Sequence, residues 1–278
     1  MELIQAGTTT GGCLARGFRV YLLEWCPPHP AARPEGLAFY GDCAIGACVS
    51  HVQAREGAPP LLVGHSLGGT LAGIFACLHP KRIRGLVLLG TPLSFGPGSS
   101  AFRDSLVALY PVPAPHHGWI PGSALSQLSV LASPESFIWP WIMDTLLTWQ
   151  DINVTRVRSM VELWALDEVG FSATLAREIW QWLYLEDRLC RGCLRVNSAT
   201  AEPANIAVPT LAVVNKNDKI APRASVVPFL ERIGRRDARL FEHAAESGIG
   251  LPHVAVLVGS DALAKLWPLI GSWIETRA

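Results

Sequence analysis

The stretch that decides the fold is Pro59-Pro60-Leu61-Leu62-Val63-Gly64-His65-Ser66-Leu67-Gly68-Gly69-Thr70. Residues 61–63 form a short apolar run behind a Pro-Pro breaker, which is typical of a buried strand in a parallel sheet. Residues 71–78 continue as an apolar helix. We expect it to end before His79-Pro80, because a residue that precedes proline disfavours the helical conformation. The stretch therefore predicts a strand, a sharp turn that carries Ser66, and a helix.

The turn matches the pattern G-x-S-x-G, the nucleophile elbow, in which a strained backbone exposes the serine hydroxyl at the carboxyl edge of a sheet. The missing side chains of Gly64, Gly68 and Gly69 are expected to let strand and helix approach each other around Ser66. The N–H of Leu67, directly after the serine, is the expected oxyanion-hole donor. A glycine-rich turn with an idle serine is the alternative, and the flanking strand and helix argue against it.

Further apolar strands are predicted at residues 83–90, 207–214 and 238–242, and helices at 37–56, at 223–233 and from 260 onwards. Strands that alternate with helices predict a parallel sheet with right-handed crossovers. We therefore expect an α/β-hydrolase fold, a mostly parallel sheet flanked by helices, with residues 1–92 and 206–278 as its core. Residues 17–25 are also predicted to form a strand. We expect that the strands that come first in an α/β-hydrolase fold are missing before this one.

Between residues 93 and 205 the alternation stops, and the chain becomes rich in Pro, Ser and Trp. We expect a helical cap inserted after the strand at 83–90, with helices near 135–150 and 172–188. Seven of the ten tryptophans lie here: Trp119, Trp139, Trp141, Trp149, Trp164, Trp180 and Trp182. Most are expected to form the core of the cap, and two or three to line an apolar tunnel for an acyl chain.

The remaining catalytic candidates follow from chain order, because an α/β-hydrolase presents serine, then acid, then histidine. Asp218 lies just past the carboxyl end of a predicted strand, where this fold places its acid; a turn or helix-capping aspartate is the alternative. Two histidines follow, His243 at the end of the last strand and His253 in the next loop. We favour His253, because a loop histidine can reach back to Ser66.

The composition fits one domain with a large core, since half of the 278 residues are hydrophobic and 17% are charged. Lys+Arg and Asp+Glu are equal at 23 each, which gives no field to attract nucleic acid or an anionic membrane. No secretory leader and no transmembrane segment are expected. Seven cysteines, an odd number, suggest reduced thiols and a cytoplasmic location. Cys190 and Cys193 form a lone C-x-x-C, so we expect no metal and no cofactor.

Several segments together resemble the polyhydroxyalkanoate synthases, members of the α/β-hydrolase superfamily. They are the elbow, residues 217–222 (Asn-Asp-Lys-Ile-Ala-Pro), residues 253–260 (His-Val-Ala-Val-Leu-Val-Gly-Ser), residues 18–25 and residues 266–273. The resemblance covers most of the chain and is strongest in its C-terminal third. It implies that Ser66, Asp218 and His253 occupy the nucleophile, acid and base positions, and that hydroxyacyl-CoA thioesters are polymerised.

Two departures from that family bear on function. The nucleophile here is serine instead of the family's cysteine, and a serine hydroxyl needs its base for attack, which favours hydrolysis. The strand and loop that donate the family's second oxyanion N–H have no counterpart before Phe18, unless residues 1–12 replace that loop.

Three hypotheses stay open. The first is a serine hydrolase acting on ester or thioester bonds of apolar (hydroxy)acyl substrates. The second is a polymerising acyltransferase that uses acyl-CoA as a homodimer or with a partner subunit. The third is a non-catalytic or truncated relative that keeps the fold.

Overall fold

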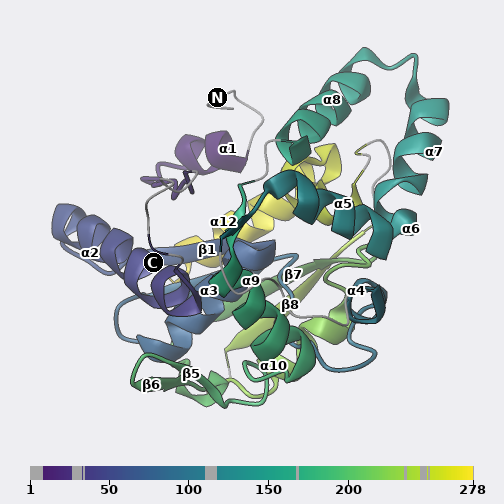
Figure 1. Ribbon diagram of the computed structural model, residues 1–278. Coiled ribbons are helices and arrows are strands. Elements are labelled where there is room, and N and C mark those ends of the chain that lie inside the picture. The colour runs from purple at the N-terminus through teal and green to yellow at the C-terminus, as the bar shows by residue number, and fades with distance from the viewer. Residues whose placement is uncertain are drawn as a thin grey trace.

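The computed structural model describes residues 9–26, 33, 35–109, 118–166, 169–234, 237–244, 249 and 251–277 (Figure 1). Its main sheet has four strands: β1 (Leu61–His65), β2 (Gly85–Leu89), β7 (Thr210–Asn215) and β8 (Ala238–His243). The strand order is β1-β2-β7-β8, and every pair is parallel. All residues of β2 and β7 are buried, as their continuous apolar sequences predict for central parallel strands. The sheet confirms the α/β-hydrolase fold.

Helices cover both faces of this sheet (Figure 1). Successive residues of a strand point to opposite faces, so β2 divides between two cores. Leu86 and Leu88 pack in a cluster with residues of α2 (Ile45–Glu56) and α3 (Ser66–Leu78). Val87 and Leu89 pack in a second cluster with η6 (Ala262–Leu266) and α12 (Trp267–Glu275). Packing on both faces fixes the sheet, so that the carboxyl ends of its parallel strands lie along one edge.

The last helical segment changes type just before its proline. The π-helix η6 runs directly into α12, and Pro268 is the second residue of α12. The other described elements are α1 (Thr9–Ala15), η1 (Phe39–Ala44), α4 (Ala101–Leu109), β3 (Trp119–Ile120), α5 (Gly122–Ala132), α6 (Pro134–Phe137), α7 (Trp139–Thr148), α8 (Ile152–Leu166), β4 (Phe171–Ser172), α9 (Ala173–Glu178), η2 (Ile179–Leu185), β5 (Leu194–Val196), β6 (Ala199–Ala201), η3 (Pro203–Asn205), η4 (Arg223–Ser225), α10 (Val227–Leu230), η5 (Pro252–Val254) and α11 (Ala255–Val258).

The strand expected at residues 17–25 is wrong. Residues 18–26 have no regular secondary structure, and Leu22 is 82% exposed. The segment is tied to the end of α2 by side chains instead, because Tyr21 Oη and Arg19 Nη1 lie 2.5 and 2.7 Å from the carboxylate of Glu56. An apolar run becomes a strand only where a neighbour completes its hydrogen bonds, and the described residues pair no strand with this one.

The segment between β2 and β7 is helical over α4–α9, as expected at 135–150 and 172–188. The division into a core and a cap at residues 93 and 205 stays a prediction. The part that returns to the sheet packs with it, since Leu183, Leu189 and Leu194 belong to the same cluster as α3.

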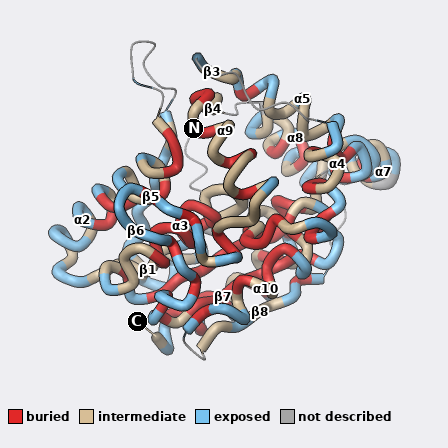
Figure 2. Tube along the Cα trace, turned by 60° about the horizontal axis from the view of Figure 1, so that its bottom comes forward, coloured by how far each residue is buried: buried red, intermediate tan, exposed pale blue. Residues whose placement is uncertain are grey.

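Most of the tryptophans of this segment are not core residues, which corrects the sequence-based expectation. Trp139, Trp141, Trp149 and Trp164 are all exposed, whereas Trp180 is buried. Figure 2 shows α7 as mainly exposed and intermediate tube at the edge of the molecule. The number of tryptophans carries no information on which helix face packs.

One further observation concerns membranes. Among the described residues, no single helix has the length and apolar character needed to cross a bilayer, whereas the bent pair Pro252–Val258 and Ala262–Glu275 meets both criteria by length and composition only.

Candidate active site

The elbow is built as a strand that runs directly into a helix. β1 ends at His65 and α3 begins at Ser66, whose φ of +51° is in the left-handed region that non-glycine residues rarely occupy. A Cβ on Gly64 would lie 2.5 Å from Gly69 Cα, and a Cβ on Gly69 would lie 2.0 Å from Thr91 Oγ1. Close packing therefore requires glycine at both positions. A Cβ on Gly68 would meet nothing within 4 Å, so the expected packing role of Gly68 is wrong.

The structure brings Ser66, His253 and Asp218 together, although they lie far apart in the sequence. Ser66 follows β1, Asp218 follows β7, and His253 lies in η5 after β8, so all three come from the carboxyl edge of the sheet. His253 Nε2 lies 2.8 Å from Ser66 Oγ, and His253 Nδ1 lies 2.7 Å from Asp218 Oδ2. With Nδ1–H donating to the carboxylate, Nε2 is the free acceptor for the serine proton.

Asp218 is fixed as an anion in a buried position. Only 2% of its surface is exposed, and its Oδ1 accepts hydrogen bonds from the N–H groups of Ile220 (2.8 Å) and Ala221 (3.1 Å). Burial pushes the pKa of Asp218 upward, but the neighbouring His253 and the two N–H donors outweigh it and hold this pKa below its usual value. A carboxylate that stays ionised can orient the imidazole and stabilise its protonated form.

Two further residues hold the histidine loop, and motif reasoning missed both. His65 Nε2 lies 3.2 Å from the carbonyl oxygen of His253, and Asn215 Nδ2 donates to the carbonyl oxygen of Pro252 at 3.3 Å. His65 ends β1 and Asn215 ends β7. The available signal was positional, because polar residues at the carboxyl ends of parallel strands meet at one edge of the sheet.

His243 and Leu67 complete the sequence-based candidates. His243 ends β8 beside a groove of about 400 Å³ lined by Leu240, Asp261 and Leu266, away from the Ser66–His253 contact. Leu67 follows Ser66 in the first turn of α3, and its role as an oxyanion-hole donor stays a prediction.

The cysteine pair of the C-x-x-C is not bridged. Cys190 is buried and Cys193 is exposed, and both are free thiols. In the described part of the chain, no group of three or more His, Cys, Asp or Glu side chains is arranged to hold a metal ion.

Comparisons with known proteins agree with this architecture. The family model described as alpha/beta hydrolase fold matches residues 10–113. A poly(3-hydroxyalkanoate) polymerase subunit PhaC from Haloferax mediterranei is 23% identical over 95% of this chain and 54% of its own length. The PhaC subunit from Thiocystis violacea is 24% identical over 98% of this chain and 75% of its own. The solved monoacylglycerol lipase from Paleococcus ferrophilus has a TM-score of 0.52 at 16% identity, covering 88% of this chain and 77% of that one.

The similarity to the solved lipase structure shows the fold alone. The chain spans about half the length of the first haloarchaeal relatives that it matches, 54% and 58%.

Proposed function

Because this chain has the α/β-hydrolase fold and is similar to PhaC subunits along nearly its whole length, we propose that it is a serine hydrolase acting on ester or thioester bonds of apolar acyl and hydroxyacyl substrates. The observation that carries the proposal is the continuous hydrogen-bonded chain Ser66–His253–Asp218. A base at 2.8 Å from the hydroxyl and an anion on the far side of that base are the parts that serine nucleophiles need.

The proposed reaction proceeds through an acyl-enzyme. Ser66 Oγ bonds to the substrate carbonyl carbon while His253 Nε2 takes the hydroxyl proton, and the Leu67 N–H donates to the oxyanion that forms. His253 returns the proton to the leaving alcohol or thiol as the C–O or C–S bond breaks. Water then attacks the acyl-enzyme, giving its proton to His253, which passes it to Ser66 as the free acid leaves. Asp218 stays ionised throughout.

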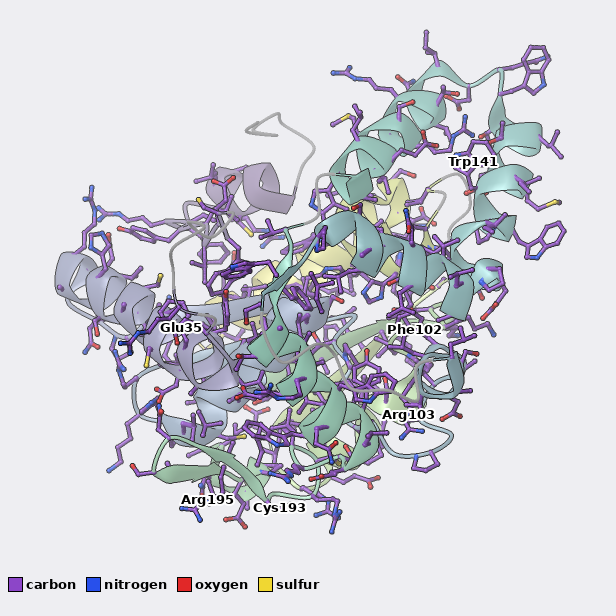
Figure 3. All side chains as sticks on the ribbon, in the orientation of Figure 1. Glu35, Phe102, Arg103, Trp141, Cys193 and Arg195 are labelled. Carbon is purple, nitrogen blue, oxygen red and sulfur yellow. The ribbon has the colours of Figure 1, made fainter. Side chains whose placement is uncertain are left out.

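The apolar substrate is supported by side chains beside the acid loop. Ile220, two residues after Asp218, packs against a cluster that includes Phe102 and the buried Trp180. Phe102 lies on α4, in the lower right of the molecule in Figure 3. Of the seven tryptophans between residues 93 and 205, Trp180 is therefore our candidate for an acyl contact.

A second candidate is favoured by one observation, the similarity to PhaC subunits over 95–98% of the chain. In a polyhydroxyalkanoate synthase-type transfer, the hydroxyl of another hydroxyacyl group replaces water as the acceptor. Such a transfer would bring an acyl-CoA substrate and a partner subunit or second copy.

Turnover of two substrates separates the candidates. We expect p-nitrophenyl butyrate and 3-hydroxybutyryl-CoA to give free acids, and a fluorophosphonate probe to label the wild type but not Ser66→Ala. Ser272→Ala, an exposed serine of α12, is the matched control and should label normally. Oligomer from the thioester would favour the transferase, and absence of both turnover and labelling would contradict both candidates.

A further inference from the structure

Strand β8 lies at one edge of the main sheet (Figure 1). Its hydrogen bonds to β7 fix the direction of its backbone groups, because the N–H and C=O of one strand residue point to the same side. The carbonyl oxygens of Asp237 and His243 accept N–H groups from the first residue of β7 and from the residue after its last. The odd-numbered residues of β8 therefore bond to β7, and the N–H and C=O groups of Leu240 and Glu242 point away from the sheet.

These outward groups have no partner in the described part of the chain. No strand other than β7 pairs with β8 there, and no hydrogen bond reaches the backbone of Leu240 or Glu242. Two N–H and two C=O groups thus lie in a row at the edge of the sheet. Such a row is the template to which an extended peptide adds as a further strand.

The groove of about 400 Å³ beside β8 follows this row of backbone groups. Residues 240–244 form one side of it. The other side comes from the segment of η6 and α12, with Asp261, Lys265, Leu266 and Leu269. This helical side runs antiparallel to β8, because Arg277 after the end of α12 donates to the carboxylate of Asp237, directly before β8 begins. Asp261 therefore lies toward the carboxyl end of β8, and Leu269 lies toward its start.

The two ends of the groove differ in chemistry. Toward the carboxyl end of β8, the carboxylates of Glu242 and Asp261 outnumber the single ammonium of Lys265, so a cationic side chain is favoured there. Toward the other end, Leu266 and Leu269 form an apolar wall, and Leu269 is 58% exposed. The complement of the groove is one cationic and one apolar side chain on the same face of a strand, which places them two positions apart.

The size of the groove favours an extended occupant. One turn of an α-helix with its side chains fills roughly 400–600 Å³. A groove of about 400 Å³ therefore has room for the side chains of a strand but not for a helix of several turns. A second copy that paired its own β8 here about a two-fold axis would bring its η6 and α12 to the same face of the joined sheet, where they would compete for this space. A single extended segment fits the groove better.

From these observations we propose that the edge of β8 binds an extended segment of a partner polypeptide, which adds antiparallel to β8 as a fifth strand of the main sheet. The antiparallel direction follows from its greater stability per residue. The segment then begins at the carboxyl end of β8, so its pattern is Arg or Lys, one residue of any kind, and an apolar residue. Ser66 and His253 take no part in this binding, and the proposal does not depend on the proposed function.

The test uses the wild-type chain and the fluorescein-labelled peptide Ser-Thr-Arg-Thr-Ile-Thr-Ser, with binding measured by fluorescence anisotropy. In the register that fills the groove, Arg lies opposite His243 and Ile lies opposite Phe241. Both peptide side chains then face η6 and α12, as Phe241 does. Replacing the peptide's Arg by Glu should weaken binding about threefold to tenfold, because an attraction of the size of an exposed ion pair becomes a repulsion.

Backbone methylation tests strand addition itself. The two Thr residues that follow Arg and Ile lie opposite Glu242 and Leu240, and each exchanges two N–H···O=C hydrogen bonds with its partner. N-methylation of these two residues should weaken binding at least about tenfold, because each loses a hydrogen bond and leaves a carbonyl unpaired. N-methylation of Arg and Ile, whose N–H groups point away from β8, is the matched control and should change binding less than about twofold.

Hydrogen exchange locates the bound peptide. The amides of Leu240 and Glu242 should exchange fast in the protein alone and be protected by the peptide, whereas the amide of Phe241, which bonds to β7, should exchange slowly in both. Leu269→Gln should weaken peptide binding about threefold or more, because the Ile side chain loses an apolar contact. Leu131→Gln, which changes an exposed leucine of α5, is the control and should bind the peptide normally.

Four outcomes would overturn the proposal. The first is no binding of the Arg peptide, and the second is an equal loss of affinity from the two methylation patterns. The third is binding that leaves the amides of Leu240 and Glu242 unprotected. The fourth is a dimer of the protein alone in which both amides are already protected, which would show that a second copy covers the edge. The peptide comparisons all use one protein, so they decide the matter even if Leu269→Gln does not fold.

Discussion

The ring of His65 packs on the ring of His253 with centroids 4.9 Å apart, and its Nε2 lies 3.2 Å from the His253 carbonyl oxygen. Burial, with the charge of a protonated His253 as a second cause, lowers the pKa of His65 from 6.5 to about 3. His65 is therefore neutral near neutral pH, and its Nε2–H donates to the carbonyl. The residue directly before the proposed nucleophile thus holds the backbone of the proposed base.

A first prediction tests this contact as a positioning device. His65→Phe keeps a ring against His253 but removes the donor, so we expect kcat on p-nitrophenyl butyrate to fall about 10- to 100-fold with little change in KM, since a misplaced catalytic group costs that much. His51→Phe, an exposed histidine of α2, should leave both constants unchanged. Equal kcat values in His65→Phe and wild type would show that the contact does not position the base.

The pH dependence of stability gives a second prediction. Between pH 6.5 and about 3 the unfolded chain binds a proton at His65 that the folded chain does not. The contribution of His65 to the free energy of unfolding is therefore constant above pH 6.5 and falls as the pH drops toward 3. Asp218, whose pKa is lowered from 3.8, adds a further loss below that value. Urea unfolding should show a shallower decline between about pH 6.5 and 4 for His65→Asn than for wild type, and parallel declines would contradict it.

The elbow glycines give a third prediction. Gly64→Ala places a Cβ 2.5 Å from backbone, and should lower the free energy of unfolding by about 2 kcal/mol or more. Gly68→Ala has open space and lies in a helix, where alanine is favoured, so stability should change by less than about 1 kcal/mol. Equal losses in the two variants, measured by urea denaturation, would mean that the elbow packs differently.

The sequence predicts a strand correctly where the residues of that one segment indicate how it is buried. β2 and residues 211–214 of β7 are continuous apolar runs, which are typical of strands buried on both faces. The expected strand at residues 17–25 is wrong because pairing depends on a neighbour, which no local pattern encodes. The exposed tryptophans of α7 were missed for a related reason, since periodicity identifies a face but not what covers it.

The residues of the candidate site also divide into those that the sequence predicts and those that it does not. Ser66 and Asp218 follow from motif and strand ends, and His253 from the reach of a loop. The contributions of His65 and Asn215 are hydrogen bonds to backbone carbonyls of that loop. Such contacts depend on the final position of the chain, and only the rule that strand ends converge pointed toward them.

The choice between two histidines gives a fourth prediction. His253→Ala should lower kcat by several orders of magnitude, as removal of a triad member does. His243→Ala, at the buried end of β8, should lower the melting temperature with a far smaller effect on kcat. Steady-state kinetics and thermal unfolding of both variants check this, and a reversed pattern would remove His253 from the proposed base position.

The last prediction concerns Ser66→Cys, which places a thiol beside the same imidazole, whose Nε2 lies 2.8 Å from Oγ in the wild type. Cysteine starts near pKa 8.5, and a neighbouring imidazolium lowers it, so a thiolate forms before attack. A thiolate attacks thioesters readily, and the acyl-enzyme is then itself a thioester that can pass its acyl group to a hydroxyl. We expect Ser66→Cys to lose most activity on oxygen esters and to keep or gain transfer from 3-hydroxybutyryl-CoA, whereas the wild type transfers mainly to water. The measurement is the ratio of free acid to oligomer for both proteins. Mostly oligomer from the wild type would make it a transferase, and no thioester turnover by either protein would confine the PhaC similarity to the fold.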